Sequence, residues 1–370
     1  MFKIASIVGA RPNFMKVAPI HRLFKQTDAF EPFLIHTGQH YDEKMSKIFF
    51  HELKMPEPDL YLGVGSGTHA KQTAAVMIEL EKVFLQETPD WIVVVGDVNS
   101  TLAASLVASK LHIPVAHVEA GLRSFDRSMP EEINRIMTDA ISDLLFVTEH
   151  SGMENLKKEG ISDEKIHFVG NVMIDSLVEH LEKAKASNIL QELNAQPGEY
   201  ALMTLHRPSN VDNRTVLRGI FDAIDQIQKK CPVYFPIHPR TKKMLIQFGL
   251  EPRIREMNNL HIIDPLGYLS FMRMMSQARL LLTDSGGIQE ESTFLGIPCI
   301  TLRENTERPI TVDMGTNQLV GSDPTAILDA FARVWSDKTD EHQVPPLWDG
   351  HAAKRIVDVF KAISQGKRTI

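Results

Sequence analysis

Residues 280–298, LLLTDSGGIQEESTFLGIP, read as a strand, a turn and a helix in close succession. The apolar start is typical of a buried parallel strand, Gly286 and Gly287 are expected to turn the chain, and 288–295 is expected to be helical. The backbone N–H groups at a helix start are unpaired, and glycine lets a phosphate come close to them. We therefore expect a diphosphate site here. The alternative is an ordinary helix cap by an Asp or Ser side chain.

The length and composition bound the class of protein. A chain of 370 residues is long for one core, so two domains are expected. The net charge of -7 and the lack of a long basic run argue against a nucleic-acid partner. Cys231 and Cys299 lie far apart, which predicts neither a disulfide framework nor a cysteine metal site. Because no stretch approaches the about 18 to 20 apolar residues of a membrane span, we expect a cytoplasmic protein without a membrane partner.

The first half of the chain alternates strands and helices. Asp97 and Glu119 each directly follow an apolar strand, and Glu131 opens a helix after Pro130. The carboxyl ends of parallel strands form the ligand-binding edge of an open sheet. Acids at that edge suit proton transfer, in which one acid is held protonated and another ionised. The strands are expected over 3–8, 33–36, 91–96, 115–118, 144–148 and 166–169.

Basic side chains are expected near these acids. Arg11 and Lys16 follow the first strand, and Arg123 follows Glu119 within the same loop. Arg135 lies one helical turn beyond Glu131, a spacing that favours an ion pair. These side chains are the candidate partners of the acids, with ordinary solvated charges as the alternative.

Alternation of strands and helices restarts in the second half. Segment 206–210 is expected to be a loop and 213–230 a helix. His206 and His238 both directly follow strands and should reach the ligand edge, although a structural histidine is the alternative for each. The last helix, 352–365, is amphipathic and is expected to pack on the first domain. The strands are expected over 200–205, 233–237, 260–263, 280–282 and 299–302.

Several longer motifs occur in order along nearly the whole chain. They are GARP at 9–12 with Lys16, GD at 96–97, HVEAGLR at 117–123, PEEINR at 130–135, HR at 206–207, TDSGGIQEE at 283–291 and TERP at 306–309. Together they resemble the non-hydrolysing UDP-N-acetylglucosamine 2-epimerases. Hydrolysing relatives typically have Arg-Ala-Asp or Arg-Ala-Glu where this chain has Arg11-Pro12-Asn13, so the non-hydrolysing branch fits better.

The resemblance implies an α/β GT-B fold, in which two Rossmann-like domains have a ligand cleft between them. Residues 1–170 would carry the catalytic acids, with helix 352–370 packing back on them, and residues 171–351 would bind UDP. The implied reaction is reversible epimerisation of UDP-N-acetylglucosamine to UDP-N-acetylmannosamine at carbon 2, through elimination and re-addition of UDP by way of a 2-acetamidoglucal. The resemblance also implies a homodimer that serves polysaccharide biosynthesis and requires no metal or redox cofactor.

Roles of individual residues follow from the same resemblance. It implies that the catalytic residues are Asp97, Glu119, Glu131, His206, Lys16 and Arg135. It implies that the substrate-binding residues are Arg11, His238, Ser285, Gly286, Gly287, Glu291, Arg308 and Phe271. Ser285, Gly286 and Gly287 would bind the diphosphate, and Glu291 would bind the ribose. Which acid serves which face of the sugar stays open.

Two segments depart from the pattern of the family. Many bacterial members continue His-Arg with Arg-Glu, where this chain has Pro208-Ser209, and the Gln39 segment has Glu43 in place of a second glutamine. We therefore expect the activation by a second UDP-sugar to be absent. Three other functions stay open: a GT-B glycosyltransferase, an epimerase of a UDP-diacetamido-uronic acid, and a non-catalytic UDP-sugar sensor.

Overall fold

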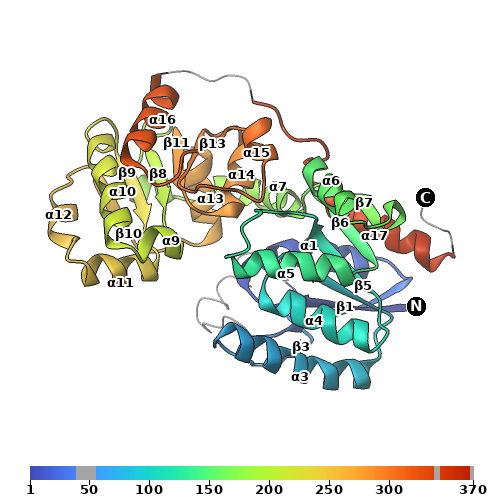
Figure 1. The fold of residues 1–370 in the computed structure, drawn as a ribbon. Coiled ribbons are helices and arrows are strands. Elements are labelled where there is room, and N and C mark those ends of the chain that lie inside the picture. Colours follow the sequence, from blue (N-terminus) through green and yellow to red (C-terminus); the bar gives the residue numbers. More distant parts are fainter. Residues whose placement is uncertain (39–55, 337–341, 367–370) are drawn as a thin grey trace. The chain divides into compact units, whose positions relative to one another are not determined.

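The computed structural model describes residues 1–38, 56–336 and 342–366 of the chain. The chain divides into two compact units, and each is built around its own parallel sheet (Figure 1). The first unit comprises Met1–Glu179 with Pro346–Ile370, and the second comprises His180–Pro345.

In the described part of the first unit, seven parallel strands have the order β3-β2-β1-β4-β5-β6-β7. They are β1 (Phe2–Val8), β2 (Phe30–His36), β3 (Leu60–Tyr61), β4 (Trp91–Val95), β5 (Val115–Ala120), β6 (Leu144–Val147) and β7 (Ile166–Phe168). The helices are α1 (Arg11–Lys25), α3 (His69–Glu87), α4 (Asn99–Lys110), α5 (Pro130–Ile141), α6 (His150–Lys158), α7 (Val172–Lys185) and α17 (Ala352–Ser364), with a 3₁₀ turn at Asp163–Lys165.

Helices cover both faces of this sheet. Ile92 and Val94 of β4 pack with apolar residues of α3 and α4 on one face. Trp91 alternates with them and points to the other face, because side chains along a strand alternate. There the ring of Phe360, from α17, contacts the rings of Trp91 and Phe146. The last described helix therefore completes the core of the unit that begins the chain.

The described part of the second unit repeats this topology with six strands in the order β10-β9-β8-β11-β12-β13. They are β8 (Ala201–Thr204), β9 (Val233–Pro236), β10 (Leu260–Ile263), β11 (Leu280–Thr283), β12 (Cys299–Thr301) and β13 (Asn317–Leu319). The helices are α8 (Ile189–Glu192), α9 (Pro208–Val211), α10 (Arg214–Ile227), α11 (Pro239–Gln247), α12 (Glu251–Arg255), α13 (Tyr268–Ser276), α14 (Gly286–Leu295), α15 (Ile310–Asp313) and α16 (Pro324–Ser336).

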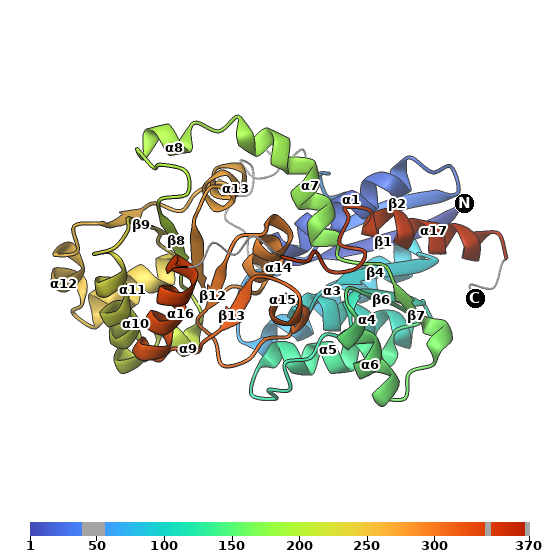
Figure 2. The ribbon, with the colours of Figure 1, turned by 90° about the horizontal axis from the view of Figure 1, so that it is seen from above.

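The run Leu280-Leu281-Leu282 is apolar throughout because both faces of β11 are covered. Leu280 and Leu282 belong to the cluster formed with α10 and α16. Leu281 belongs to the opposite cluster, which includes Met274 of α13 and Ile288 of α14. In Figure 2, α13 and α14 lie on one side of β11 and β12, and α10 and α16 lie on the other. A continuous apolar run is what a strand buried on both faces requires.

Both sheets reverse their strand order at one point. The reversal falls between β1 and β4 in the first unit and between β8 and β11 in the second. In open parallel sheets, ligands bind beyond the carboxyl ends of the strands at such a reversal. The predicted acids and the predicted phosphate motif therefore each lie at, or directly beside, such a point.

Two local predictions are wrong. Gly286 and Gly287 do not turn the chain before a helix, because α14 already begins at Gly286 and neither glycine has a positive φ. Segment 206–210 is not only a loop, because Pro208 begins the short helix α9. Proline is favoured at the first position of a helix, where its missing N–H would have no partner anyway.

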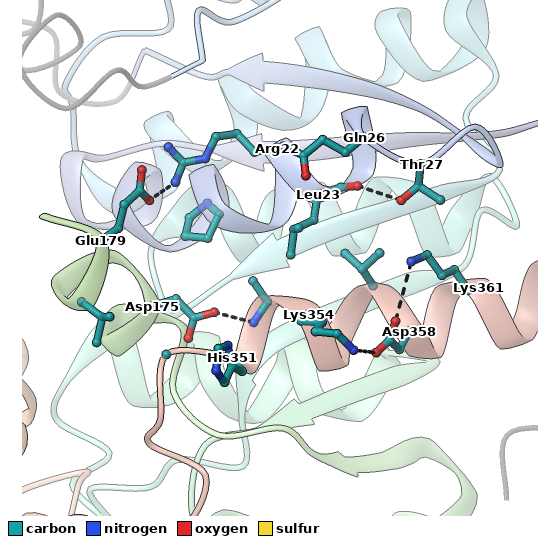
Figure 3. A pocket seen from close by; sticks show the side chains of 15 residues that line it. Arg22, Leu23, Gln26, Thr27, Asp175, Glu179, His351, Lys354, Asp358 and Lys361 are labelled. Carbon is teal, nitrogen blue, oxygen red and sulfur yellow. Dashed lines mark hydrogen bonds and ion pairs between the residues drawn. The ribbon is translucent and has the colours of Figure 1, made fainter.

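The start of α7 is fixed to the first unit by polar contacts (Figure 3). The Asp175 carboxylate accepts hydrogen bonds from the backbone N–H groups of Ala352 (3.0 Å) and Ala353 (2.7 Å) at the start of α17. Ser176 donates to the Met15 carbonyl, whose partner in α1 is missing because Pro19 has no N–H. The compact units therefore divide after Glu179 and Pro345, whereas the sequence-based division falls after residues 170 and 351.

Candidate functional site

Lys16 and Glu119 form a buried ion pair at the ligand edge of the first sheet. Lys16 lies in the second turn of α1, and Glu119 lies near the end of β5. Lys16 Nζ is 2.6 Å from Glu119 Oε2, and the side chains are 10% and 2% exposed. Glu119 has a φ of 69°, and the register of β5 shifts beside it. Such a backbone costs about 1 to 3 kcal/mol for a residue other than glycine, and strain of this kind concentrates at functional sites.

Asp97 is held by a buried arginine. It follows β4 directly after Gly96, and its carboxylate pairs with Arg135 Nη1 from α5. The Asp97 side chain is 31% exposed, whereas that of Arg135 is 2% exposed. The buried guanidinium thus fixes the position of the Asp97 carboxylate, and the exposed part of the carboxylate remains accessible to a ligand.

Glu132 anchors this arrangement, so the predicted pairing of Arg135 with Glu131 is wrong. Arg135 Nε and Nη2 donate to Glu132 Oε2 at 3.0 and 2.7 Å. Glu132 also accepts from the backbone N–H groups of Ser124 (3.0 Å) and Phe125 (2.9 Å). Burial alone would raise the pKa of Glu132, but these bonds outweigh burial and lower it. Within the described residues, the half-buried Glu131 makes no ion pair or hydrogen bond.

Asn13 and His117 join the strand ends that carry the acids. Asn13 Nδ2 donates to the Val95 carbonyl (2.8 Å), which links the start of α1 to β4. The His117 ring lies 2.8 Å from the Gly96 carbonyl through Nε2 and 2.6 Å from Asp139 through Nδ1. His117 begins one of the sequence motifs and Asn13 directly follows another, but their positioning role has no local sequence signal because their partners come from other elements.

Arg123 is not a partner of the predicted acids. Its Nη1 lies 2.7 Å from Asp139 Oδ2, and its Nε and Nη2 donate to Glu159 at 2.8 and 2.7 Å. Burial would raise the pKa of Asp139, but the nearby charges of His117 and Arg123 lower it. Arg123 therefore stabilises the loop after β5 by binding it to Asp139 and Glu159.

In the second unit, Asp284 organises the strand reversal. Its carboxylate is fully buried and accepts from the backbone N–H groups of His206 (2.9 Å) and Arg207 (2.7 Å). His206 Nδ1 lies 2.8 Å from the same carboxylate. Burial would raise the pKa of Asp284, but the bond from His206 and the backbone donors lower it. Asp284 therefore fixes the turn after β8 and does not cap α14.

The start of α14 has the features of an anion site. Within the described chain, the N-cap residue Ser285 makes no side-chain capping hydrogen bond there, and its own N–H donates to Thr283 Oγ1 at 3.0 Å. A methyl group added at Gly287 would meet no described atom within 4 Å, whereas one at Gly286 would lie 2.9 Å from Arg308 Nη1. Unpaired N–H groups, open space and a nearby guanidinium favour an oxyanion. The alternative of an ordinary capped helix does not match this geometry.

Arg308 is itself held by two buried carboxylates. Its Nε lies 2.7 Å from Glu290 Oε1, and its Nη1 pairs with Glu307. Burial would raise the pKa of Glu307, but the charges of Arg308 and Arg303 bring it well below its ordinary value. The guanidinium is therefore fixed in orientation before any ligand arrives.

The remaining predicted binding residues lie on neighbouring elements of the second unit. The Tyr268 hydroxyl donates to Glu291 Oε1 (2.8 Å). The His238 ring caps α11 by accepting from Arg240 N, and its centroid is 5.5 Å from that of His206. Burial, followed by the charge of His206, lowers the pKa of His238. Phe271 is half-buried against the apolar cluster beneath α13.

Some predictions concern atoms outside the described residues. The Arg11 side chain and the segment with Gln39 and Glu43 are in that category. Across 1–38, 56–336 and 342–366, no group of His, Cys, Asp and Glu is arranged to hold a metal ion. No helix in the same part of the chain is long and apolar enough to cross a membrane.

Two units, each with a parallel sheet of Rossmann topology, one with ion-paired acids and one with an open helix start, define a protein of the GT-B fold class. Residues 22–361 match the family described as UDP-N-acetylglucosamine 2-epimerase. The chain belongs to this family.

Individual relatives agree with this assignment. The chain is 47% identical to a UDP-N-acetylglucosamine 2-epimerase of Methanococcus maripaludis, over 97% of this chain and 98% of the relative. It is 42% identical to the UDP-2,3-diacetamido-2,3-dideoxy-D-glucuronate 2-epimerase of Pseudomonas aeruginosa, over 96% and 98%. A crystal structure of the Methanocaldococcus jannaschii UDP-GlcNAc 2-epimerase with UDP-GlcNAc and UDP matches with a TM-score of 0.91 and 46% identity, covering 97% of this chain and 99% of that chain. The predictions of family and fold are confirmed.

Proposed function

We propose that this protein interconverts UDP-N-acetylglucosamine and UDP-N-acetylmannosamine by inverting carbon 2. The observation that carries the proposal is the pair of fixed carboxylates at the first sheet, Glu119 on Lys16 and Asp97 on Arg135. Epimerisation needs one group that removes a proton from one face of the sugar and another that delivers a proton to the opposite face. Two carboxylates with different burial and different cations suit these two tasks.

The reaction balances without an external oxidant or reductant. A base takes the proton from carbon 2, the C1–O bond breaks, and its electron pair leaves with the diphosphate oxygen of UDP. A double bond forms between carbons 1 and 2, which gives 2-acetamidoglucal. In the return step, UDP attacks carbon 1 and an acid protonates carbon 2 on the other face. We assign these proton transfers to Asp97, Glu119 and Glu131, with Lys16 and Arg135 as supporting cations.

The second unit binds the UDP part in this proposal. Gly286 and Gly287 at the start of α14 hold the diphosphate through backbone N–H groups, next to Arg308, and Ser285 binds it through its hydroxyl because its own N–H donates to Thr283 Oγ1 (3.0 Å). Charge that develops on the departing diphosphate is stabilised by donors already oriented toward it. Glu291, positioned by the Tyr268 hydroxyl, binds the ribose hydroxyls. The other predicted contacts with the substrate are made by His206, His238, Arg11 and Phe271.

Incubation with UDP-N-acetylglucosamine in heavy water tests the proposal. The expected result, followed by NMR, is UDP-N-acetylmannosamine that carries deuterium at carbon 2, because solvent exchanges with the catalytic acids. A glycosyltransferase or a UDP-sugar sensor would incorporate no deuterium. Absence of both the product and the label would reject the proposal.

A second candidate has the same chemistry on a different sugar. The 42% identity to the Pseudomonas aeruginosa enzyme extends over 96% of this chain, so a UDP-diacetamido-uronic acid is the rival substrate. Comparison of kcat/KM for the two UDP-sugars distinguishes them. A higher value for the uronic acid would move the assignment to that substrate.

We further propose that a second UDP-sugar does not activate this enzyme. Pro208 begins α9 and Ser209 follows it, where many bacterial members have Arg and Glu. Epimerisation that starts from pure UDP-N-acetylmannosamine should proceed without a lag. A long lag that added UDP-N-acetylglucosamine abolishes would contradict this.

Assembly, location and pathway are further parts of the proposal. The free thiols of Cys231 and Cys299 are buried, which suits a reducing cytoplasm. We propose a cytoplasmic homodimer whose product feeds polysaccharide biosynthesis. Light scattering should give a mass of about twice 41.7 kDa, and a deletion strain should lack the corresponding glycan.

A further inference from the structure

Phe125 has an unusual environment for a phenylalanine. Its side chain is 78% exposed, and its backbone has a φ of 58°. Left-handed backbone is unfavourable for a bulky side chain, and exposure of an aromatic ring forgoes the gain from its burial. At Thr88, His112 and Asn194 a positive φ occurs at or just after a helix end, where it is common. Phe125 lies in no such position.

The backbone of Phe125 is held in place by the acid site. Its N–H donates to Glu132 Oε1 at 2.9 Å, and the preceding Ser124 donates to Glu132 Oε2 through N (3.0 Å) and Oγ (2.9 Å). Glu132 binds Arg135, and Arg135 binds Asp97. A continuous set of polar contacts thus fixes the position of this exposed residue with respect to a proposed catalytic carboxylate.

Retention of the intermediate is a task that an exposed aromatic ring, tied to this carboxylate through Glu132 and Arg135, can perform. The 2-acetamidoglucal is neutral and, once the C1–O bond has broken, has no covalent link to UDP. An aromatic ring packs against the apolar C–H face of a sugar and excludes water from it. We propose that Phe125 covers the sugar ring at the acid site and keeps the glucal bound while UDP is detached. This inference rests on the proposed epimerase function.

The partition between product and released intermediate tests the inference. The enzyme is given UDP-N-acetylglucosamine, and UDP-N-acetylmannosamine, free UDP and free 2-acetamidoglucal are measured over time. In Phe125→Ala, the ratio of released glucal to epimerised product should rise by about 10-fold, because the uncovered glucal escapes before UDP returns. Phe125→Tyr, which keeps an aromatic ring, should retain the wild-type ratio.

Two further variants separate a role in covering the sugar from a role in folding. Phe125→Gly removes the ring and also relieves the left-handed backbone, so it should be at least as resistant to thermal unfolding as the wild type while releasing as much glucal as the alanine variant. Leu85→Ala is the matched control, because Leu85 is 63% exposed on α3 and makes no part of the acid site. It should leave the ratio unchanged.

The outcomes are distinguishable from a failure of the proposed function. If the wild type neither epimerises nor incorporates deuterium, the function itself fails. If the wild type does both and Phe125→Ala has the wild-type ratio, the inference about Phe125 is overturned. A change only in oligomeric mass or melting temperature, with the ratio intact, also overturns it, because the exposed ring would then serve assembly or stability.

Discussion

The two strand reversals use buried charge in opposite ways. In the first unit, Arg135 is buried and the carboxylate that it holds, on Asp97, is partly exposed. In the second unit, the carboxylate of Asp284 is buried and its partner His206 is partly exposed. The same sheet topology thus leaves the Asp97 carboxylate partly exposed to solvent at one site and helix N–H groups open at the other.

The difference shows how one topology supports two tasks. Asp284 accepts hydrogen bonds from the backbone of the neighbouring turn. It is therefore suited to fixing the conformation of that turn and unsuited to proton transfer. The Asp97 carboxylate is fixed by the Arg135 side chain from α5 and remains partly exposed to solvent. A carboxylate at the end of a parallel strand is therefore a candidate catalyst only if the backbone has not already bound it.

The largest expected effect is on turnover when the proposed catalytic acids of the first unit, Asp97 and Glu119, lose their charge. Asp97→Asn or Glu119→Gln should lower kcat by about 10³-fold, because an amide cannot exchange a proton at carbon 2. UDP affinity should change by less than about 3-fold, because α14 is untouched. Steady-state kinetics and calorimetric titration with UDP check this. Near-normal turnover in both variants would show that these carboxylates of the first sheet are not catalytic, and would contradict the contrast with Asp284 in the second sheet.

Removal of the buried carboxylate should instead affect stability. Asp284→Asn should lower the free energy of unfolding by about 3 to 4 kcal/mol, because the variant loses a buried acceptor for the His206 ring and places an N–H donor among backbone donors. Asp97→Asn should cost less than about 1 kcal/mol, because that pair is partly exposed. Urea denaturation of both variants provides the test, and equal losses would contradict the assigned roles.

Asp175 is a buried carboxylate to which no Lys or Arg side chain of the described residues is bound. Its contribution to the free energy of unfolding should therefore depend on pH differently from that of Asp284. Burial raises the pKa of Asp175 to about 6 despite its hydrogen bonds from Ala353 and Ala352. The charge of Asp349 raises this pKa further, and that of His351 lowers it. A raised folded-state pKa gives a contribution that is fully present below the ordinary value of 3.8 and is lost as the pH rises through about 6. The loss amounts to about 2 to 3 kcal/mol. Asp284, whose pKa is lowered, contributes in the opposite sense, since its stabilisation is lost as the pH falls below its ordinary range.

Asp175→Asn measures this contribution directly. The difference in unfolding free energy between wild type and variant should change between pH 4 and pH 6 in favour of the variant. A difference that is constant over this range would show that Asp175 does not titrate there in the folded protein.

The smallest expected effect is at the proposed phosphate site. Gly287→Ala should weaken UDP binding by about 10-fold, because the methyl group would enter the open space at the start of α14. Its stability should be unchanged or higher by about 0.5 kcal/mol, since alanine suits a helix better. Gly286→Ala is the matched control, and it should be less stable because its methyl group meets Arg308 and Glu307 at 2.9 Å. Unchanged UDP affinity in Gly287→Ala would show that the start of α14 does not bind UDP.

The sequence was sufficient to predict most of the described strands, including the edge strand β10, but it missed the edge strands β3 and β13. Leu260–Ile263 was predicted to the residue, since a short apolar run between polar turns has few alternative readings. β3 and β13 were missed, because strands of two and three residues carry too little pattern. β2 was expected to begin at residue 33, but it already begins at Phe30, before Pro32. Pro32 is tolerated there because β3 pairs only with Ile35 and His36.

The roles of site residues could be predicted where both interacting side chains lie within one sequence motif, and not where the partner comes from a distant segment. The choice between Glu131 and Glu132 as the partner of Arg135 depends on which side of α5 faces inward, and both spacings suit a helix. The role of Asp284 depends on the neighbouring strand β8, nearly 80 residues earlier in the chain. His117, Asp139 and Asn13 were likewise invisible as positioning residues, since their contacts exist only after the strands have paired.

The insertion of the second unit within the first has a consequence for biosynthesis. Phe360 of α17 belongs to the core formed with Phe24, Phe30, Trp91 and Phe146, yet it leaves the ribosome after the whole of His180–Pro345. Domains generally fold as units during synthesis. The second unit can therefore reach its native fold first, while the unit that begins the chain cannot complete its core until α17 has been synthesised. A nascent chain stalled before α17 should protect the second sheet from protease and leave the first open to it.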